Sequence, residues 1–316
     1  MVPGQGVQYP GMLEGLHTNH RGFRNHLNAV LDLAPGSLAS RLLAVVRNDN
    51  RIEDSDLSDC RLTHPLVFAV HYALAETLRT EGIEPDYVLG YSLGELTAST
   101  INGSLPLPTA LRLAIDTGIW VAEHTPERQM MAILAAPEIQ QACYPYFEAT
   151  TVACHNYAEH FVITGTAGEL EAIAIELRHE GVHHELLPIN RGFHSSAMDP
   201  FEEHAAQWSR SIEWQSCRAP LISCALRKVA SPSELKRNHL GTIHRQPVHF
   251  AETFRAIEAD WTPDYIDLSA TGTLAAFARQ LISPSRRSSL YTVHSRFGEG
   301  QKHFEHFLTR WAKRTA

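Results

Sequence analysis

Ser92 has the neighbours of a catalytic nucleophile. It is the central residue of Gly90-Tyr91-Ser92-Leu93-Gly94, after a β-rich run at residues 87–89 and before a run compatible with a helix. This is the strand, tight turn and helix order of a nucleophile elbow, in which the glycines permit close packing and the turn exposes the serine hydroxyl. Free N–H groups at a helix N-terminus also favour developing negative charge. The segment predicts a catalytic serine, although five residues alone could equally form a plain turn.

Two other segments could complete such a site, because a serine nucleophile needs a base, a group that orients the base, and donors for the oxyanion. His194 lies between Gly192-Phe193 and Ser195, in a loop that follows a region of shorter expected elements at about residues 126–187. Residues 1–12 are rich in glycine and proline, and such a loop brings backbone N–H groups close to a strand or a ligand. Taken singly, a loop histidine is more often structural, and the first loop could be a simple turn.

Length and composition are those of a globular protein with a large core. The chain has 316 residues, of which 44% are hydrophobic, and this allows one large α/β domain or a domain with an inserted subdomain. The longest apolar run, residues 66–78, is interrupted by His71 and Tyr72, so we expect a buried helix rather than a membrane span. Residues 1–4 lack a basic region followed by an apolar core, so we expect a cytoplasmic protein without a secretion signal.

Charge and metal-ligand spacing exclude several other functions. The formal net charge of −8, without a block of lysine or arginine, disfavours binding to nucleic acid. The five cysteines are odd in number and lack C-x-x-C spacing, which argues against a disulfide framework or a zinc ribbon. The histidines include pairs such as His155/His160 and His183/His184, but none has the spacing of a metal-ligand motif, so no metal site is predicted.

The order of the expected elements suggests an inserted subdomain. Helical periodicity is strong at residues 63–80, with Thr63 as the cap and Pro65 in the first turn, and again at 106–120. Shorter elements then follow the order strand, helix, two strands, helix, strand, which is that of a ferredoxin-like unit, at residues 130–135, 138–147, 151–154, 161–164, 169–179 and 184–187. We therefore predict a subdomain at residues 126–188, inserted into a large α/β domain formed by residues 1–125 and 189–316.

Several blocks together resemble a known family in their order and intervals, namely Pro3–Gln8, Gly90–Glu95, Asn156, Gly192–Ser195 and Gln246–Val248. The family is that of malonyl-CoA:acyl-carrier-protein transacylases and polyketide synthase acyltransferase domains, and the resemblance extends from Pro3 to about Leu274. It implies a large α/β-hydrolase-like domain with a parallel sheet and an inserted ferredoxin-like α+β subdomain. It also implies ping-pong catalysis through an acyl-serine.

Carried over position by position, the resemblance gives each block a role. Ser92 is the expected nucleophile, and His194 is the expected general base and later general acid. The backbone N–H groups of Gln5 and Leu93 are the expected oxyanion hole, and a main-chain carbonyl at Gln246 steadies the histidine in place of an acid. No bound cofactor is implied. The acyl carrier is the phosphopantetheine arm of an acyl carrier protein, a transient partner, or coenzyme A.

Two positions depart from the family members that use malonyl groups. Those members carry an arginine that clamps the substrate carboxylate by a bidentate pair, and Thr117 stands in its place. A desolvated, unpaired carboxylate would cost on the order of several kcal/mol, so malonyl selection is not expected unless Arg112 or Arg191 reaches the pocket. Tyr91 replaces the usual histidine before the serine. Both changes resemble the arginine-less branch of discrete enzymes from trans-acyltransferase polyketide pathways. The residues expected to contact substrate are Tyr91, Thr117, Trp120, Asn156 and Phe193.

The sequence therefore predicts a serine acyltransferase that moves a non-malonyl acyl group from a carrier-bound thioester to a second carrier, or releases it to water. A malonyl-CoA:acyl-carrier-protein transacylase and a catalytically silent carrier-docking module remain alternatives. An unrelated α/β-hydrolase would need an acid between serine and histidine in the chain, and neither Asp116 nor Asp199 is a persuasive match. Neither nucleic acid nor a membrane is an expected partner.

Overall fold

The central sheet of the large domain is parallel. In this computed structural model, which describes residues 1–49, 52–142, 146–286, 288–296 and 300–315, β1 (Val88–Gly90) pairs in parallel with β6 (Leu221–Ser223), and β8 (Asp264–Asp267) pairs in parallel with β9 (Ser289–Thr292). The short strand β7 (Lys228–Val229) adds an antiparallel edge beside β6. Val2 bridges to Gly90 in parallel, and the Met1 ammonium donates to Ile266 O at 2.7 Å, so the first residues join the two strand pairs into one layer.

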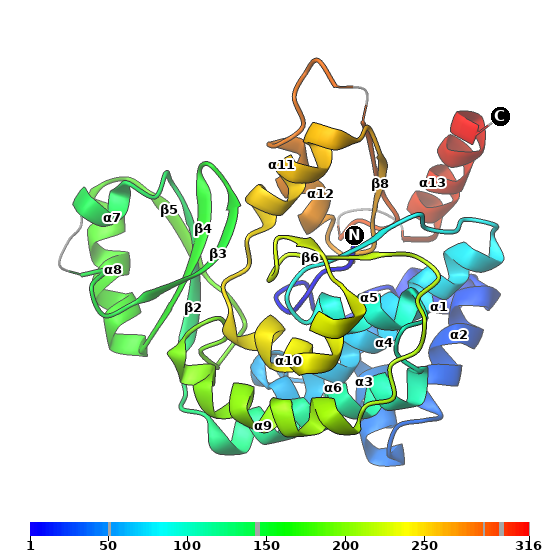
Figure 1. Cartoon of the computed structure of the whole chain (residues 1–316), viewed down its shortest axis with the longest axis horizontal. Coiled ribbons are helices and arrows are strands. Elements are labelled where there is room, and N and C mark those ends of the chain that lie inside the picture. The colour runs from blue at the N-terminus through cyan, green and yellow to red at the C-terminus, as the bar shows by residue number, and fades with distance from the viewer. Residues whose placement is uncertain (50–51, 143–145, 287, 297–299, 316) are drawn as a thin grey trace.

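Helices surround this layer and bury it in one core (Figure 1). The long helix α4 packs against α2, α5 and α6, and its apolar stripe lies in that core. The helical elements of this part are α1 (Glu14–Asn19), α2 (Arg21–Leu31), α3 (Gly36–Val46), η1 (Asp54–Ser58), α4 (Cys60–Thr80), α5 (Gly94–Ile101), α6 (Leu107–His124), η2 (Ser196–Met198), α9 (Asp199–Ser211), α10 (Pro232–Arg245), α11 (Phe250–Asp260), α12 (Thr273–Arg279) and α13 (Gly300–Thr315).

Helix α4 begins at Cys60, and the prediction that Thr63 caps it was wrong. Asp59 is the cap, because its carboxylate accepts from the Arg61 N–H at 2.9 Å. Thr63 lies inside the helix, where its hydroxyl donates to Asp59 O at 3.1 Å. Pro65 therefore lies beyond the first turn. Because proline has no backbone N–H, the Arg61 carbonyl lacks the hydrogen bond that residue 65 would otherwise donate. The helix nevertheless continues through Pro65.

A second, antiparallel sheet forms a ferredoxin-like unit at one end of the molecule (Figure 1). Its elements follow the predicted order, and its strands lie in the order β3-β4-β2-β5. Its core is separate from the main one and includes Met131, Phe161 and Leu170. The predicted boundaries at residues 126 and 188 stay a prediction, and part of the helix predicted at 138–147 lies outside the described residues. The elements are β2 (Gln129–Leu134), α7 (Ile139–Ala142), β3 (Thr151–Tyr157), β4 (His160–Gly165), α8 (Ala167–His179) and β5 (His183–Leu186).

Other sequence expectations concern cysteines, metals and membranes. Cys60, Cys154, Cys217 and Cys224 are free thiols, whereas Cys143 lies outside the described residues. Within the described residues, no group of three or more histidine, cysteine, aspartate or glutamate side chains has an arrangement that could hold a metal ion. The helices of this same part of the chain include none with the length and apolar character needed to span a membrane.

The buried histidines predict a loss of stability in mild acid. Burial lowers the pKa of His71 to about 3 and the pKa values of His194, His239 and His244 to about 4, and it lowers the pKa of His64 well below its usual value. Below about pH 6.5 the unfolded chain binds protons on these groups and the native protein does not, so stability falls as the pH drops. We expect the free energy of unfolding, measured by urea denaturation, to fall by on the order of several kcal/mol between about pH 7 and pH 4.5.

A matched variant isolates one of these groups. His71→Leu removes a buried histidine from α4 and should lower the number of protons taken up on unfolding by about one. A wild-type stability that does not change with pH over this range would contradict the expectation, as would an unchanged slope in the variant.

Candidate active site

Ser92 occupies the turn between β1 and α5, as expected for a nucleophile elbow. β1 ends at Gly90 and α5 begins at Gly94, and the Ser92 backbone has a φ of 54°, in the left-handed region that is uncommon for a residue with a side chain. A Cβ at Gly94 would overlap the Val2 carbonyl oxygen, and one at Gly90 would lie 2.5 Å from Glu95 Cα. Glycine at both ends therefore allows strand, first loop and helix to approach closely.

The Ser92 hydroxyl and the His194 imidazole are hydrogen-bonded. Ser92 Oγ lies 2.8 Å from His194 Nε2, and His194 Nδ1 lies 2.8 Å from the Gln246 carbonyl oxygen. Because a carbonyl oxygen can only accept, Nδ1 carries the ring proton and Nε2 is the acceptor that faces the serine. This is the tautomer that a general base needs. The fold thus brings together three residues that the sequence analysis grouped, although 102 positions separate the first two.

The backbone and the burial of His194 fix its orientation and its charge. Its N–H donates to His244 O at 2.7 Å, and its φ of 62° lies in the left-handed region. Burial lowers the pKa of His194 to about 4, an effect that the hydrogen bond to Gln246 partly opposes and the nearby His244 reinforces. The imidazole is therefore neutral at neutral pH and able to accept a proton.

The first loop lies against the elbow, where an oxyanion would form. A Cβ at Gly4 would lie 2.9 Å from Tyr91 O and 3.0 Å from Ser92 Cβ, so glycine permits this approach. Within the described residues, neither the Gln5 N–H nor the Leu93 N–H donates to a backbone carbonyl. The two N–H groups that the sequence analysis named are therefore available to a substrate oxygen.

Side chains of α4, which the sequence analysis did not assign to the site, fix the position of Gln5. The Gln5 amide donates to Thr63 Oγ1 at 2.5 Å, and its carbonyl accepts from His64 Nε2 at 3.0 Å. His64 is fully buried. The available signal was the polar pair Thr63-His64 close before the apolar run at residues 66–70, but the prediction of a helix cap assigned Thr63 to the start of the helix.

Tyr91 and Asn156 connect the elbow with the subdomain. Tyr91 Oη donates to Asn156 Oδ1 at 2.9 Å, and Asn156 Nδ2 lies 3.1 Å from His160 Nδ1. Burial raises the pKa of Tyr91 well above its usual value, and the neighbouring Cys154 adds to the shift. The Tyr91 hydroxyl is thus engaged by the subdomain. His160 was missed, because nothing in its sequence neighbourhood indicates this contact.

The same strand of the subdomain also supports the segment that carries Gln246. In β3, the His155 N–H donates to Val248 O at 2.8 Å, and the Val248 N–H donates to Ala153 O at 2.8 Å. Val248 follows Gln246 by two positions. The edge of β3 therefore contacts both Tyr91, the residue before Ser92, and the segment whose carbonyl at Gln246 accepts from His194.

Phe193 and Trp120 lie in different surroundings. The Phe193 ring is buried, with its centroid 5.4 Å from that of His64. Trp120 stacks on His124 and His204 with centroid separations of 4.7 and 4.8 Å, so it lies between α6 and α9. Among the described residues, no ring contact joins Trp120 directly to the catalytic pair.

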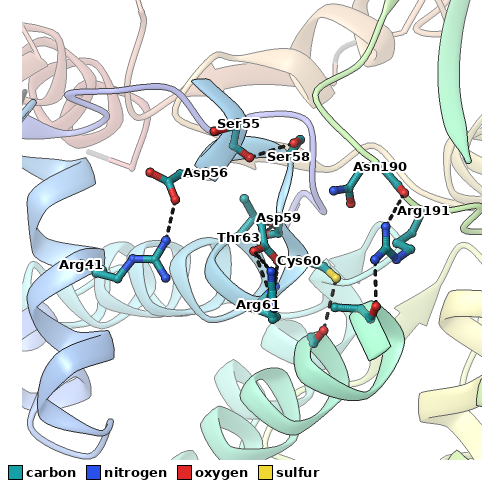
Figure 2. A network of polar contacts seen from close by, with 12 residues as sticks. Arg41, Ser55, Asp56, Ser58, Asp59, Cys60, Arg61, Thr63, Asn190 and Arg191 are labelled. Atoms are coloured by element: carbon teal, nitrogen blue, oxygen red, sulfur yellow. Dashed lines mark hydrogen bonds and ion pairs between the residues drawn. The ribbon is translucent and has the colours of Figure 1, made fainter. Parts of the chain in front are cut away.

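Thr117, on α6, is fully buried and neutral. Its hydroxyl has no hydrogen-bond partner in the described part of the chain. Arg112 points outward, with a side chain 81% exposed, and pairs with Asp116 at 3.3 Å. Arg191 is buried but turned toward the C-terminal part of α6, where its guanidinium donates to Ala122 O at 2.8 Å (Figure 2). Both arginines that were considered as substitute clamps are therefore engaged elsewhere.

A cavity of about 640 Å³ lies at the opposite end of β1 from Ser92. Residues at the starts of β1 and β8 line it, together with the exposed pair Tyr87 and Trp261, whose ring centroids are 4.6 Å apart. None of the predicted site residues lines this cavity, so it is separate from the candidate active site.

Known proteins resemble this chain in sequence and in fold. The acyl transferase domain family matches residues 1–315. The polyketide biosynthesis protein ThaF of Burkholderia thailandensis is 34% identical over 95% of this chain, but the chain spans only 26% of ThaF. The polyketide biosynthesis acyltransferase homolog BaeD of Bacillus velezensis is 31% identical over 96% of this chain and 94% of its own length. A loading acyltransferase from the avermectin modular polyketide synthase has the same fold, with a TM-score of 0.86 and 23% identity over 100% of this chain and 98% of its own. The predicted fold class is confirmed.

The geometry predicts that Ser92 stays reactive in mildly acidic solution. The neutral form of His194 is the expected base, and burial lowers the pKa of His194 to about 4, so we expect this form to be lost only as the pH falls through that value. The rate at which a fluorophosphonate modifies the protein, followed by mass spectrometry while circular dichroism verifies folding, should be constant from about pH 7 to pH 5. His194→Ala should lower this rate by about 10²- to 10⁴-fold, and Ser92→Ala should abolish it. A loss of reactivity centred near pH 6.5 would contradict the expectation.

Proposed function

The chain belongs to the acyl transferase domain family and is an acyltransferase, and from this premise we propose that it acts in polyketide biosynthesis on acyl thioesters of a phosphopantetheine arm. The acyl group lacks a free carboxylate, passes through an acyl-Ser92 intermediate, and goes to a second acyl carrier protein or to water. The hydrogen-bonded series Ser92, His194 and Gln246 carries this proposal. The relatives ThaF and BaeD, both named as polyketide biosynthesis proteins, support the pathway class.

The first half-reaction forms the acyl-enzyme. As Ser92 Oγ attacks the thioester carbonyl carbon, its proton moves to His194 Nε2, while Gln246 O holds the other ring proton. The negative charge that develops on the carbonyl oxygen is stabilised by the N–H groups of Gln5 and Leu93. The C–S bond then breaks, and the departing thiolate takes the proton from Nε2, so that His194 is neutral again.

The second half-reaction uses the same groups in reverse. A carrier thiol or a water molecule gives its proton to His194 Nε2 and attacks the acyl-Ser92 carbonyl. Collapse of the tetrahedral intermediate breaks the ester bond, and Ser92 Oγ recovers the proton. The product is a new thioester when a thiol attacks and a free acid when water attacks. Neither route requires a bound cofactor.

The neutral surroundings of Thr117 support the choice of acyl group. A carboxylate placed near this residue would meet an uncharged hydroxyl, with Arg112 on the outer face of α6 and the terminal nitrogens of Arg191 bonded to backbone carbonyls. Such a carboxylate would lose its hydration without gaining a cationic partner. Neutral acyl groups avoid this cost.

One observation keeps the malonyl alternative testable. The Nε atom of Arg191 is buried and has no hydrogen-bond partner within the described residues. If malonyl groups load efficiently and Arg191→Gln abolishes that loading, Arg191 is the carboxylate partner and the proposal for non-malonyl groups is wrong. The docking-module alternative requires instead that Ser92 never becomes acylated.

The two possible acceptors can be distinguished with one carrier-bound substrate. A carrier protein bearing an acetyl thioester is incubated with the enzyme and a second, unloaded carrier of different mass. Appearance of the acyl group on the second carrier identifies transfer, and appearance of acetate identifies hydrolysis. Ser92→Ala is the control for spontaneous exchange.

Thr117→Arg should raise the use of malonyl thioester and lower the use of acetyl thioester. The new guanidinium can form a bidentate pair with the malonyl carboxylate, whereas its desolvation is uncompensated beside a neutral acyl group. We expect the ratio of kcat/KM values for malonyl and acetyl thioesters, followed by thiol release, to rise by at least about tenfold.

Thr117→Val is the matched control, because it keeps the branched shape of the side chain and replaces the unpaired hydroxyl with a methyl group. It should leave the acetyl rate within about threefold of wild type. If Thr117→Arg folds and the malonyl-to-acetyl ratio does not change, residue 117 does not contact the acyl group.

A further inference from the structure

Glu95 and His239 are buried polar side chains that the mechanism above does not use. Glu95 lies in the first turn of α5, directly after the elbow, and is fully buried, and His239 lies in α10 and is 3% exposed. Glu95 Oε2 lies 3.3 Å from His239 Nε2. In the described part of the chain both atoms are buried without a hydrogen-bond partner, and the contact between them is a close approach that does not have hydrogen-bond geometry. Because buried polar atoms without partners are costly, each atom is the natural partner of the other.

The surroundings favour an uncharged form of this pair. Burial raises the pKa of Glu95 to about 8 and lowers the pKa of His239 to about 4, so both groups are neutral at neutral pH. Glu95 Oε1 accepts from the Ala225 N–H at 2.9 Å, which leaves Oε2 to carry the proton. A protonated carboxyl can donate to an unprotonated imidazole nitrogen, and no charge is then buried.

The helical segment that begins at His239 leads directly to the two backbone carbonyls that accept hydrogen bonds from His194. The backbone of α10 leaves helical geometry at Asn238, with φ −165° and ψ 43°, so residues 239–245 form a separate helical segment. At its C-terminal end, His244 O accepts from the His194 N–H, and Gln246 O, in the residue that follows, accepts from His194 Nδ1. The direction of this short segment therefore determines where the general base lies.

The contact between Glu95 and His239 joins this segment to the helix that follows the nucleophile. Glu95 N donates to Ser92 O at 2.8 Å, so its backbone is continuous with the elbow. The Glu95 side chain then reaches both the loop after β6 and the start of the 239–245 segment. The turn that carries Ser92 and the segment at residues 239–245 that holds His194 are thus linked by a buried side-chain contact as well as by the Ser92–His194 hydrogen bond itself.

We propose that Glu95 and His239 are positioning residues for the acyl transfer reaction. The protonated Glu95 carboxyl donates to His239, and this contact sets the direction of residues 239–245. The Gln246 carbonyl and Ser92 Oγ are thereby held at hydrogen-bonding distance on opposite sides of the His194 ring. This inference rests on the roles proposed above for Ser92 and His194.

Two substitutions separate the neutral contact from an ion pair. In Glu95→Gln, the amide oxygen can still accept from Ala225 and the amide nitrogen can still donate to His239, so the rate of Ser92 modification by a fluorophosphonate should stay within about threefold of wild type. His239→Leu removes the acceptor, and the displaced segment should lower that rate by about a hundredfold. The ¹⁵N shifts of the His194 ring should show loss of the single Nδ1–H tautomer in His239→Leu and its retention in Glu95→Gln.

Controls make each outcome decisive. His71→Leu, which also removes a fully buried helical histidine, should keep the wild-type rate and the His194 tautomer in the folded protein. A wild-type rate of Ser92 modification in folded His239→Leu would overturn the inference while leaving the proposed function intact. A hundredfold loss of that rate in Glu95→Gln would do the same. If His239→Leu does not fold, the rate of Glu95→Gln decides between the two outcomes. An unreactive wild-type Ser92 would instead overturn the proposed function, and this inference with it.

Discussion

The hydrogen bond between His194 Nδ1 and the Gln246 carbonyl is the interaction on which the catalytic arrangement depends. A carbonyl fixes the ring tautomer without introducing a negative charge, so no buried carboxylate raises the pKa of the histidine and burial keeps it neutral. A backbone group cannot rotate away as a side chain can. The carbonyl does, however, move with the chain segment to which it belongs. The surrounding fold must therefore hold residues 239–248 in place.

The ferredoxin-like unit contributes to this task as well as to the site. Its strand β3 pairs with Val248, and Asn156 at the end of the same strand accepts from Tyr91, the residue before the proposed nucleophile. The unit is also inserted immediately before the His194 loop. A movement of β3 would therefore disturb the surroundings of His194 and Ser92 together. The unit, which has a core of its own, thus contacts both the segment that carries Gln246 and the turn that carries Ser92.

The elbow, the order of the elements and the grouping of Ser92 with His194 were predictable, because they depend on local spacing and on a resemblance that covers most of the chain. The cap of α4 was predicted wrongly, because Thr63 and Asp59 both have side chains that can cap a helix. Only the fold reveals that the Thr63 hydroxyl accepts a hydrogen bond from Gln5 while Asp59 caps the helix. Contacts such as those of His160 with Asn156 join side chains whose proximity is set by strand register or domain packing. No pattern in one sequence encodes such proximity.

The proposed function requires that Ser92 accept acyl groups that carry no carboxylate. The most direct test is the intact mass of the protein after brief incubation with equal concentrations of acetyl and malonyl thioesters of pantetheine, with Ser92→Ala as the control. We expect a mass increase of one acetyl group on the wild-type protein, mapped by digestion to Ser92, and no malonyl adduct. A dominant malonyl adduct, or an acyl group on any residue other than Ser92, would contradict it.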